Sequence, residues 1–359
     1  MAQQTKLSKI ALFNELLKDP DRKSLIRIIT EFISLAIFHR SFPRHYFTRY
    51  LFKKGDTNIK DYFPNHFLYH NLKPFLNNKD LKDVVENKLF FNLFYEQFNI
   101  SLPKILLYNH KKIFVVNDKY FEINQLQDFR THLENIFVQN PSYDSIIIKR
   151  TYGSYGGDQV YKLFSNQLSS DNEEVEKIFS EVIKEGFLFQ ETVRQHPDLN
   201  RLNPASLNTI RFDTFIDQEG KVEIISGYIR MSTTQLHVDN ASSGGCKVGI
   251  NILTGALKKK GYMPFNTHGV KVLTAHPVTN TIFENLSIPF FNQAKDLVIK
   301  AASLMPGLRL VGWDVAIGES GPVLIEGNSD YNLAGSDLTA GGYRANPVFQ
   351  KVLRELNYL

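Results

Sequence analysis

Hydrophobic residues recur at helical spacing through the first seventy residues. Leu12, Leu16 and Leu17 form one run and residues 25–36 form a second, with Asp19-Pro20 between them. Apolar positions three and four residues apart are typical of amphipathic helices, and proline ends them. The pattern predicts a mainly helical region over residues 1–70.

Helical and strand patterns then alternate. Helices are expected over residues 80–98, 124–137 and 171–185, and strands over 104–109, 112–116 and 145–149. The stretches GFLFQETV, TIRFDTFI and VEIISGYIRMS follow, so strand signals dominate the second half. Helices packed on antiparallel sheets make an α+β fold.

A hairpin is predicted near the C-terminus, where apolar runs at 310–317 and 322–326 flank Gly318-Glu319-Ser320-Gly321. A three-residue loop ending at a left-handed Gly321 pairs Gly318 with Pro322. Asp314 then lies opposite Glu326, and Gly312 lies opposite Asn328.

Two carboxylates in that position repel each other unless a cation lies between them. Asp314, Glu326 and Asn328 offer the hard oxygen atoms that Mg²⁺ prefers, and Mg²⁺ also binds substrate phosphates. The alternative is a register one residue different, in which one acid faces solvent.

A glycine-rich loop follows the strand that ends at Lys149. The sequence KRTYGSYGGDQV resembles neither G-x-x-x-x-G-K-[ST] nor a Rossmann turn, because it leads into a second strand. Glycines there can bring backbone N–H groups close to phosphate oxygens. A plain turn is the alternative for this loop taken alone.

Composition narrows the class of protein. The 359 residues are 43% hydrophobic and 22% charged, as in soluble globular proteins. The one cysteine, Cys246, excludes an internal disulfide framework and is expected to be a small buried residue. No secretory signal or spanning segment is recognised, so a cytoplasmic protein is expected.

Positive charge is concentrated at the N-terminus, where residues 1–60 carry a net charge of +7 and the remainder −2. SFPRHYFTRYLFKK, residues 41–54, interleaves basic and aromatic residues and suits weak peripheral contact with a membrane surface. The alternative is a helical face packed on the main domain. Lys258-Lys259-Lys260 is expected to be a solvated turn, and no nucleic-acid partner is expected.

The lysine at a strand end, the glycine-rich loop and the paired-carboxylate hairpin together resemble the ATP-grasp superfamily, over roughly residues 80–328. The resemblance implies two α+β lobes that sandwich ATP. It divides the chain into a basic helical region (1–70), an N-terminal ATP-grasp part with the lid (71–190) and a C-terminal lobe (191–359). The implied nucleotide-binding residues are Lys88, Lys149, the lid residues Gly153, Ser154, Tyr155, Gly156 and Gly157, and the hinge residues Gln190, Glu191 and Val193. The implied Mg²⁺ ligands are Asp314, Glu326 and Asn328.

LNTIRFDTF and the stretch SGYIRMSTTQLHVDNASSGGCKVGINILTGAL are similar to sugar-transfer-associated and teichuronopeptide-type ATP-grasp proteins of polysaccharide biosynthesis. The resemblance implies a substrate linked to glycan or amino-acid conjugation. It assigns catalytic roles toward phosphate or acyl-phosphate to Arg211, Arg230 and Lys247. The alternatives are pairing with a structural acid for the two arginines and a solvated position for Lys247. The resemblance assigns substrate contacts to His237, Asp239, Asn240 and Arg344, for which surface or structural roles are the alternatives.

The expected activity is an ADP-forming ligase that uses ATP and Mg²⁺ to join a small-molecule or glycan-linked carboxylate to an amine through an acyl-phosphate. One alternative is a kinase of the same fold that phosphorylates a hydroxyl group. Another is a nucleotide-binding scaffold of a glycan assembly system.

Overall fold

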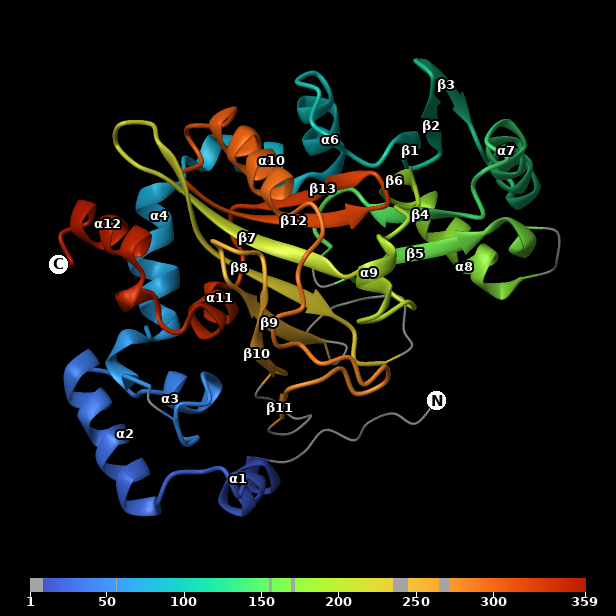
Figure 1. Cartoon of the computed structure of the whole chain (residues 1–359). Helices are drawn as coiled ribbons and strands as arrows, with labels where there is room; N and C mark the ends of the chain where they lie inside the picture. The colour runs from blue at the N-terminus through green and yellow to red at the C-terminus, as the bar shows by residue number, and fades with distance from the viewer. Residues whose placement is uncertain (1–8, 56, 155–156, 169–171, 235–244, 265–270) are drawn as a thin grey trace.

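Two antiparallel sheets organise the protein (Figure 1). The computed structural model describes residues 9–55, 57–154, 157–168, 172–234, 245–264 and 271–359. The smaller sheet has six strands in the order β3-β2-β1-β6-β4-β5, and the larger has seven in the order β11-β10-β9-β8-β7-β12-β13. This mixed architecture of helices and antiparallel sheets confirms the predicted α+β class.

The smaller sheet is covered by α7 (Leu126–Gln139) and α8 (Glu173–Val182). Phe129, Ile178 and Phe189 are fully or almost fully buried in the core between them. Its strands are β1 (Ile105–His110), β2 (Ile113–Val116), β3 (Lys119–Glu122), β4 (Ser145–Arg150), β5 (Val160–Phe164) and β6 (Gly186–Glu191).

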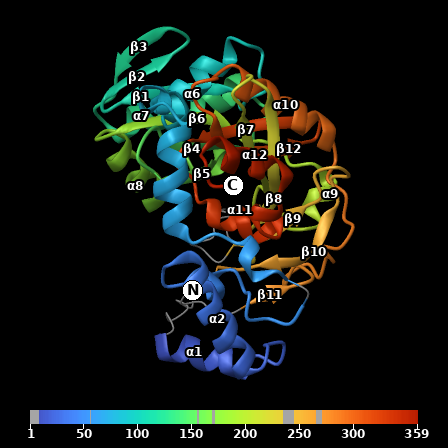
Figure 2. The same cartoon turned by 90° about the vertical axis from the view of Figure 1, so that its left-hand side faces the viewer.

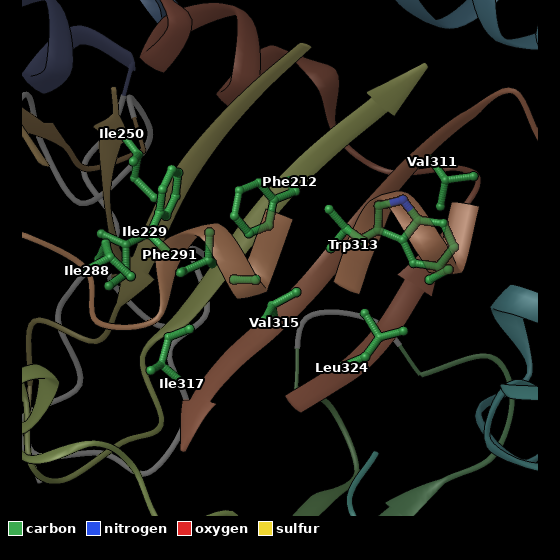
Figure 3. Close-up of a cluster of buried hydrophobic side chains, with 14 of the residues drawn as sticks. Phe212, Ile229, Ile250, Ile288, Phe291, Val311, Trp313, Val315, Ile317 and Leu324 are labelled. Carbon is green, nitrogen blue, oxygen red and sulfur yellow. The ribbon is translucent and has the colours of Figure 1, made fainter. Parts of the chain in front are cut away.

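The larger sheet has one apolar face and one polar face because side chains alternate along each strand. Phe212, Trp313 and Val315 pack on the apolar face with Phe291 of α10 (Phe291–Ser303), as Figure 3 shows. The strands are β7 (Thr209–Ile216), β8 (Val222–Met231), β9 (Cys246–Ile250), β10 (Leu257–Tyr262), β11 (Val272–Leu273), β12 (Leu310–Gly318) and β13 (Gly321–Asn328). The opposite face carries the polar residues described below.

The N-terminal region is helical, as predicted. It contains α1 (Lys9–Lys18), α2 (Leu25–His39), α3 (His45–Thr48) and η1 (Ile59–Asp61). Figure 2 shows α1 and α2 at the opposite end of the molecule from β1, β2 and β3. In the described part of the chain, no helix combines the length and apolar character needed to cross a membrane.

The basic aromatic segment 41–54 packs inward. Tyr46, Tyr50 and Phe52 are at most 4% exposed, and the Tyr50 hydroxyl donates to the Met263 carbonyl at 2.8 Å. These three aromatic residues pack inward, as the alternative expected, whereas Phe42 of the same segment is 73% exposed.

The helix predicted over 80–98 is wrong as a single element. The chain forms η3 (Lys79–Leu81), α5 (Lys82–Glu86) and α6 (Lys88–Glu96). Asn87 has extended backbone angles, and its side chain accepts from the backbone N–H groups of Leu89 and Phe90. An asparagine in that role starts a new helix, which outweighs the continuous apolar pattern.

The remaining helices connect or cover these layers. They are η2 (Phe67–Leu72), α4 (Lys73–Leu76), η4 (Ser165–Gln167), α9 (Pro197–Asn200), α11 (Leu333–Ala340), η6 (Tyr343–Ala345) and α12 (Pro347–Glu355). The predicted boundary at residue 190 falls inside β6, one residue before its end. Lys258-Lys259-Lys260 is exposed but lies within β10, so its prediction as a turn is wrong.

Candidate active site

The β12–β13 hairpin brings the two predicted acids together. Asp314 pairs with Glu326 and Gly312 with Asn328, which confirms the predicted register. The predicted turn is wrong, because Gly318 pairs with Gly321 around a two-residue turn. A bulge between Leu324 and Glu326 inserts one residue and restores the pairing further along.

Asp314 is the anionic centre of a buried ion cluster. Arg211 donates to it through Nε and Nη2, at 2.5 and 3.0 Å, and Arg230 donates through Nη2 at 2.7 Å. Burial alone would raise the pKa of Asp314, but the two guanidinium groups hold it well below its usual range. Asp314 is thus a carboxylate in this fold.

Glu326 has the opposite electrostatic environment. Burial raises the pKa of its carboxyl group, and the neighbouring Asp314 carboxylate raises it further. Asn328 donates from Nδ2 to Glu326 Oε1 at 3.2 Å. A like-charge pair of this kind is what a divalent cation would relieve.

Two lysines reach the cluster from the other side. Lys149, at the end of β4, is 6% exposed. Burial and the nearby Lys88 lower the pKa of Lys149 to about 8, although Glu326 favours its charged form. Lys88 is the first residue of α6 and donates from Nζ to the Ser154 carbonyl and hydroxyl oxygens at 3.3 and 3.1 Å. Lysines and acids that are distant in sequence therefore meet.

The lid is described in part. Gly153 and Gly157 have φ angles of +73° and +79°, which residues with a Cβ rarely adopt. Ser154 lies between them and contacts Lys88. Tyr155 and Gly156 lie outside the described residues.

The donor set fits Mg²⁺. Glu326 and Asn328 supply a carboxylate and an amide oxygen, which are the oxygen ligands that hard cations prefer. Asp314 accepts three hydrogen bonds from the arginines, and a carboxylate has about four acceptor sites, so one site remains for a metal. Groups of three or more His, Cys, Asp or Glu residues able to hold a metal are absent from the described residues, so Asn328 is needed to complete the set.

Lys247 lies on β9 and pairs with Arg230 on β8. Its ammonium group is 5.5 Å from the centre of the Tyr228 ring. Burial and the charges of Arg230, Arg211 and Arg49 together lower the pKa of Lys247 to about 8. Lys247 and the two arginines therefore place several cations close to the Asp314 carboxylate.

The side chains of two predicted hinge residues, Gln190 and Glu191, form hydrogen bonds within the protein. Gln190 donates to Asn92 Oδ1 at 2.8 Å and to the Pro103 carbonyl at 3.0 Å. Glu191 accepts from the Lys104 backbone N–H and the Tyr143 hydroxyl. Val193 lies beyond the end of β6.

Of the predicted substrate residues, Arg344 lies in the described part of the chain, and it packs away from the cluster. The Arg344 guanidinium lies 5.2 Å from the Phe38 ring centre and 4.7 Å from that of Phe63, against the N-terminal region. This packing matches the structural alternative for Arg344, and its contact with a substrate carboxylate stays a prediction. His237, Asp239 and Asn240 lie outside the described residues.

The structure adds polar residues that the sequence analysis missed. Asp213, fully buried, accepts from the Ser226 and Tyr343 hydroxyls at 2.6 and 2.8 Å. Arg49 of the N-terminal region pairs with buried Asp337 of α11 at 3.1 Å. Period-two alternation in TIRFDTFI puts Asp213 on the same face as Arg211 and was a usable signal, whereas nothing local marks Arg49.

Comparison with known proteins decides the family. The model of the family described as sugar-transfer associated ATP-grasp matches residues 68–352. The chain belongs to this family. The ATP-grasp membership predicted from the lysines, the lid and the hairpin is thereby confirmed, and no curated protein matches the chain.

Solved structures with similar folds are distant in sequence. D-alanyl-alanine synthetase A from Vibrio cholerae is 12% identical, with a TM-score of 0.43 over 76% of this chain and 66% of that one. D-cycloserine synthetase DcsG is 10% identical, with a TM-score of 0.43 over 78% and 73%. The biotin carboxylase domain of 2-oxoglutarate carboxylase from Hydrogenobacter thermophilus, a complex with MgADP, is 12% identical, with a TM-score of 0.42 over 76% and 45%. The ATP-grasp chain thus spans just under two thirds of the first protein and less than half of the third.

Proposed function

We propose that this ATP-grasp protein is an ADP-forming ligase that joins a carboxylate to an amine, using ATP and Mg²⁺. The observation that supports this proposal most is electrostatic. Glu326, which pairs with Asp314 in the hairpin, interacts with Lys88 and Lys149 of the other predicted lobe. Catalysis of phosphoryl transfer is almost entirely positioning and electrostatic stabilisation, and it needs cations beside a metal site.

The nucleotide would lie between the two sheets, with residues 71–190 and 191–359 forming the two lobes. Lys88 and Lys149 would bind the phosphates, with Lys88 held at the start of α6 by the Asn87 cap. Glu326, Asn328 and one remaining site on Asp314 would hold Mg²⁺. When bound, the cation neutralises charge on the terminal phosphates.

In the first step, a substrate carboxylate oxygen forms a bond to the γ-phosphorus, and the bond to the β-phosphate bridging oxygen breaks to release ADP. In the second step, an amine nitrogen attacks the acyl carbon, phosphate leaves, and the nitrogen loses a proton. Arg230, with 17% of its side chain exposed compared with 7% for Arg211, is the arginine we assign to the acyl-phosphate. Arg211 is assigned to hold Asp314.

The substrate class follows from charge and family. Arg230 and Lys247 lie on neighbouring strands and offer two cations that could bind a carboxylate-bearing acceptor. The sugar-transfer association of the family supports a glycan-linked acid of polysaccharide biosynthesis as the substrate. The ligase would act in the cytoplasm, where ATP is supplied.

Calorimetric titration with a non-hydrolysable ATP analogue tests the nucleotide site. Binding is expected with Mg²⁺ and is expected to be lost in Glu326→Ala. Glu284→Ala is the matched control, because Glu284 is an exposed acid paired with Lys259 at 3.5 Å. Absence of binding to folded wild-type protein would remove the proposal.

Hydroxylamine trapping tests the reaction. Candidate acids are incubated with ATP, Mg²⁺ and hydroxylamine, and the ligase is expected to form ADP and a hydroxamate in equal amounts. ADP formation that depends on the acceptor but gives no hydroxamate would indicate a kinase instead.

A further inference from the structure

The outer face of α2 is an exposed apolar stripe. Ile26, Ile29, Ile33 and Ile37 are 77%, 58%, 52% and 73% exposed. Their spacing of three or four residues puts them on one side of the helix. Phe42, just after the helix, is 73% exposed. A contiguous apolar surface of this kind marks an interaction site more often than isolated exposed residues do.

The fold holds this helix in place, so the stripe is preformed. Ile28 and Leu35 on the inner side are buried, and Phe32 packs edge-on against Tyr46 at 6.2 Å between ring centres. Ser24 caps the first turn by accepting from the Arg27 N–H. The outward direction of the isoleucines is therefore set by the core of the N-terminal region, and binding need not fold the helix.

A shallow groove of about 460 Å³ runs beside the stripe. Its lining is Thr30, Ile33, Ser34, Ile37, Phe38 and Lys60. The Lys60 ammonium lies 5.3 Å from the centre of the Phe38 ring, at the edge of an otherwise uncharged surface. An apolar floor with a cation at its edge matches an acyl chain that ends in an anionic headgroup.

The charges around the stripe are basic. Arg27, Arg40 and Arg44 are exposed. Glu31, the acid on α2, is directed away from solvent, because it accepts from Lys23, Arg27 and Tyr46, each at 2.8 Å, and only 15% of its side chain is exposed. A second copy of this chain placed on the stripe would bring two basic rims together, whereas an anionic bilayer would neutralise one.

We infer that α2 docks the enzyme on an anionic lipid bilayer, with the isoleucine stripe and Phe42 in the headgroup region and the arginines on lipid phosphates. This surface shares Phe42 and Arg44 with the predicted segment 41–54 but is centred on α2, because Tyr46, Tyr50 and Phe52 of that segment are buried. It lies at the end of the molecule opposite β1, β2 and β3 (Figure 2). The inference is independent of the ligase chemistry.

Vesicle flotation of the full chain tests it. Wild-type protein is expected to float with equimolar phosphatidylcholine and phosphatidylglycerol at low salt, and not with phosphatidylcholine alone. Ile33→Ser/Ile37→Ser is expected to weaken partitioning at least about tenfold, because interfacial binding scales with buried apolar area. Arg40→Gln/Arg44→Gln is expected to weaken it by about fivefold for each charge removed.

Val138→Ser/Leu253→Ser is the matched control, because these residues are 77% and 87% exposed and lie on α7 and in the loop between β9 and β10. It should float like the wild type, and all variants should melt like it. Absence of flotation by the wild type, equal binding to neutral vesicles, or unchanged flotation of both α2 variants would overturn the inference. A wild-type dimer that Ile33→Ser/Ile37→Ser converts to a monomer, with no flotation of either, would assign the stripe to a second copy.

Discussion

The two acids of the β12–β13 hairpin should respond in opposite ways to the same chemical change. Asp314→Asn removes the negative partner of Arg211 and Arg230 while keeping the side-chain shape. Asp314 is fully buried and accepts three guanidinium hydrogen bonds of 2.5–3.0 Å. Removing one partner of a buried ion pair costs about 3–5 kcal/mol, because the other charge stays buried without compensation.

Glu326→Gln should not destabilise the metal-free protein. Glu326 lies opposite Asp314, and the fold must either keep two like charges together or protonate Glu326. Glutamine avoids both costs, and substitutions that relieve strain at a functional site commonly gain about 0.5–2 kcal/mol.

Thermal unfolding in EDTA measures both effects. At about 2 °C per kcal/mol for a protein of this size, Asp314→Asn should lower the Tm by about 6–10 °C and Glu326→Gln should raise it by about 1–4 °C. Glu284→Gln is the control for an exposed acid and should leave the Tm unchanged. An equal loss in the two hairpin variants would refute the assignment of Asp314 to the arginines and of Glu326 to the metal.

Three further outcomes are expected. Asn87→Ala should lower stability by about 1 kcal/mol in chemical denaturation by removing the α6 cap, and should weaken binding of an ATP analogue because Lys88 loses its fixed position. Gly312→Ala should cost about 1–3 kcal/mol, because the added Cβ would lie 2.8 Å from the buried Tyr331 ring. The pKa of Lys247 in the fold is about 8, which is below its pKa in the unfolded chain. Between these two pKa values, the free energy of unfolding of the wild type should rise with pH relative to that of Lys247→Met. The sign follows because the unfolded chain keeps the proton in that window, and the slope is at most about 1.4 kcal/mol per pH unit.

Each of these has a contrasting control. Asn172→Ala removes the cap of α8, which is remote from Lys88, so it should destabilise without a specific loss of nucleotide affinity. Gly220→Ala tests glycine loss with nothing within 4 Å, so only its φ of +83° contributes strain. A pH profile of Lys247→Met parallel to that of the wild type would contradict the buried position of the ammonium group.

Local pairing was predictable because it depends on short-range geometry. Period-two alternation fixed which residues of 310–328 share a face, and the glycines near 318–321 fixed where the chain reverses. The predicted pairing of Asp314 with Glu326 is correct. The turn is one residue shorter than predicted and the bulge adds one residue, so the two differences cancel in the register. Burial of Cys246 was also predictable from its apolar surroundings, and it is fully buried, with burial raising the pKa of its thiol to about 12.

The sequence by itself therefore determined the α+β class, the alternating faces of the strands and the family, whereas the helix over 80–98 and the turn at 258–260 were wrong. Only the tertiary structure decided that Arg211 and Arg230 neutralise Asp314, that Arg49 reaches Asp337, 288 residues away, and that Arg344 lies against Phe38. The order of strands in a sheet and the packing of an N-terminal helix come from long-range burial of apolar surface. Residue spacing along the chain carries no record of those contacts, because strand alternation specifies which face a side chain occupies and not which strand lies beside it.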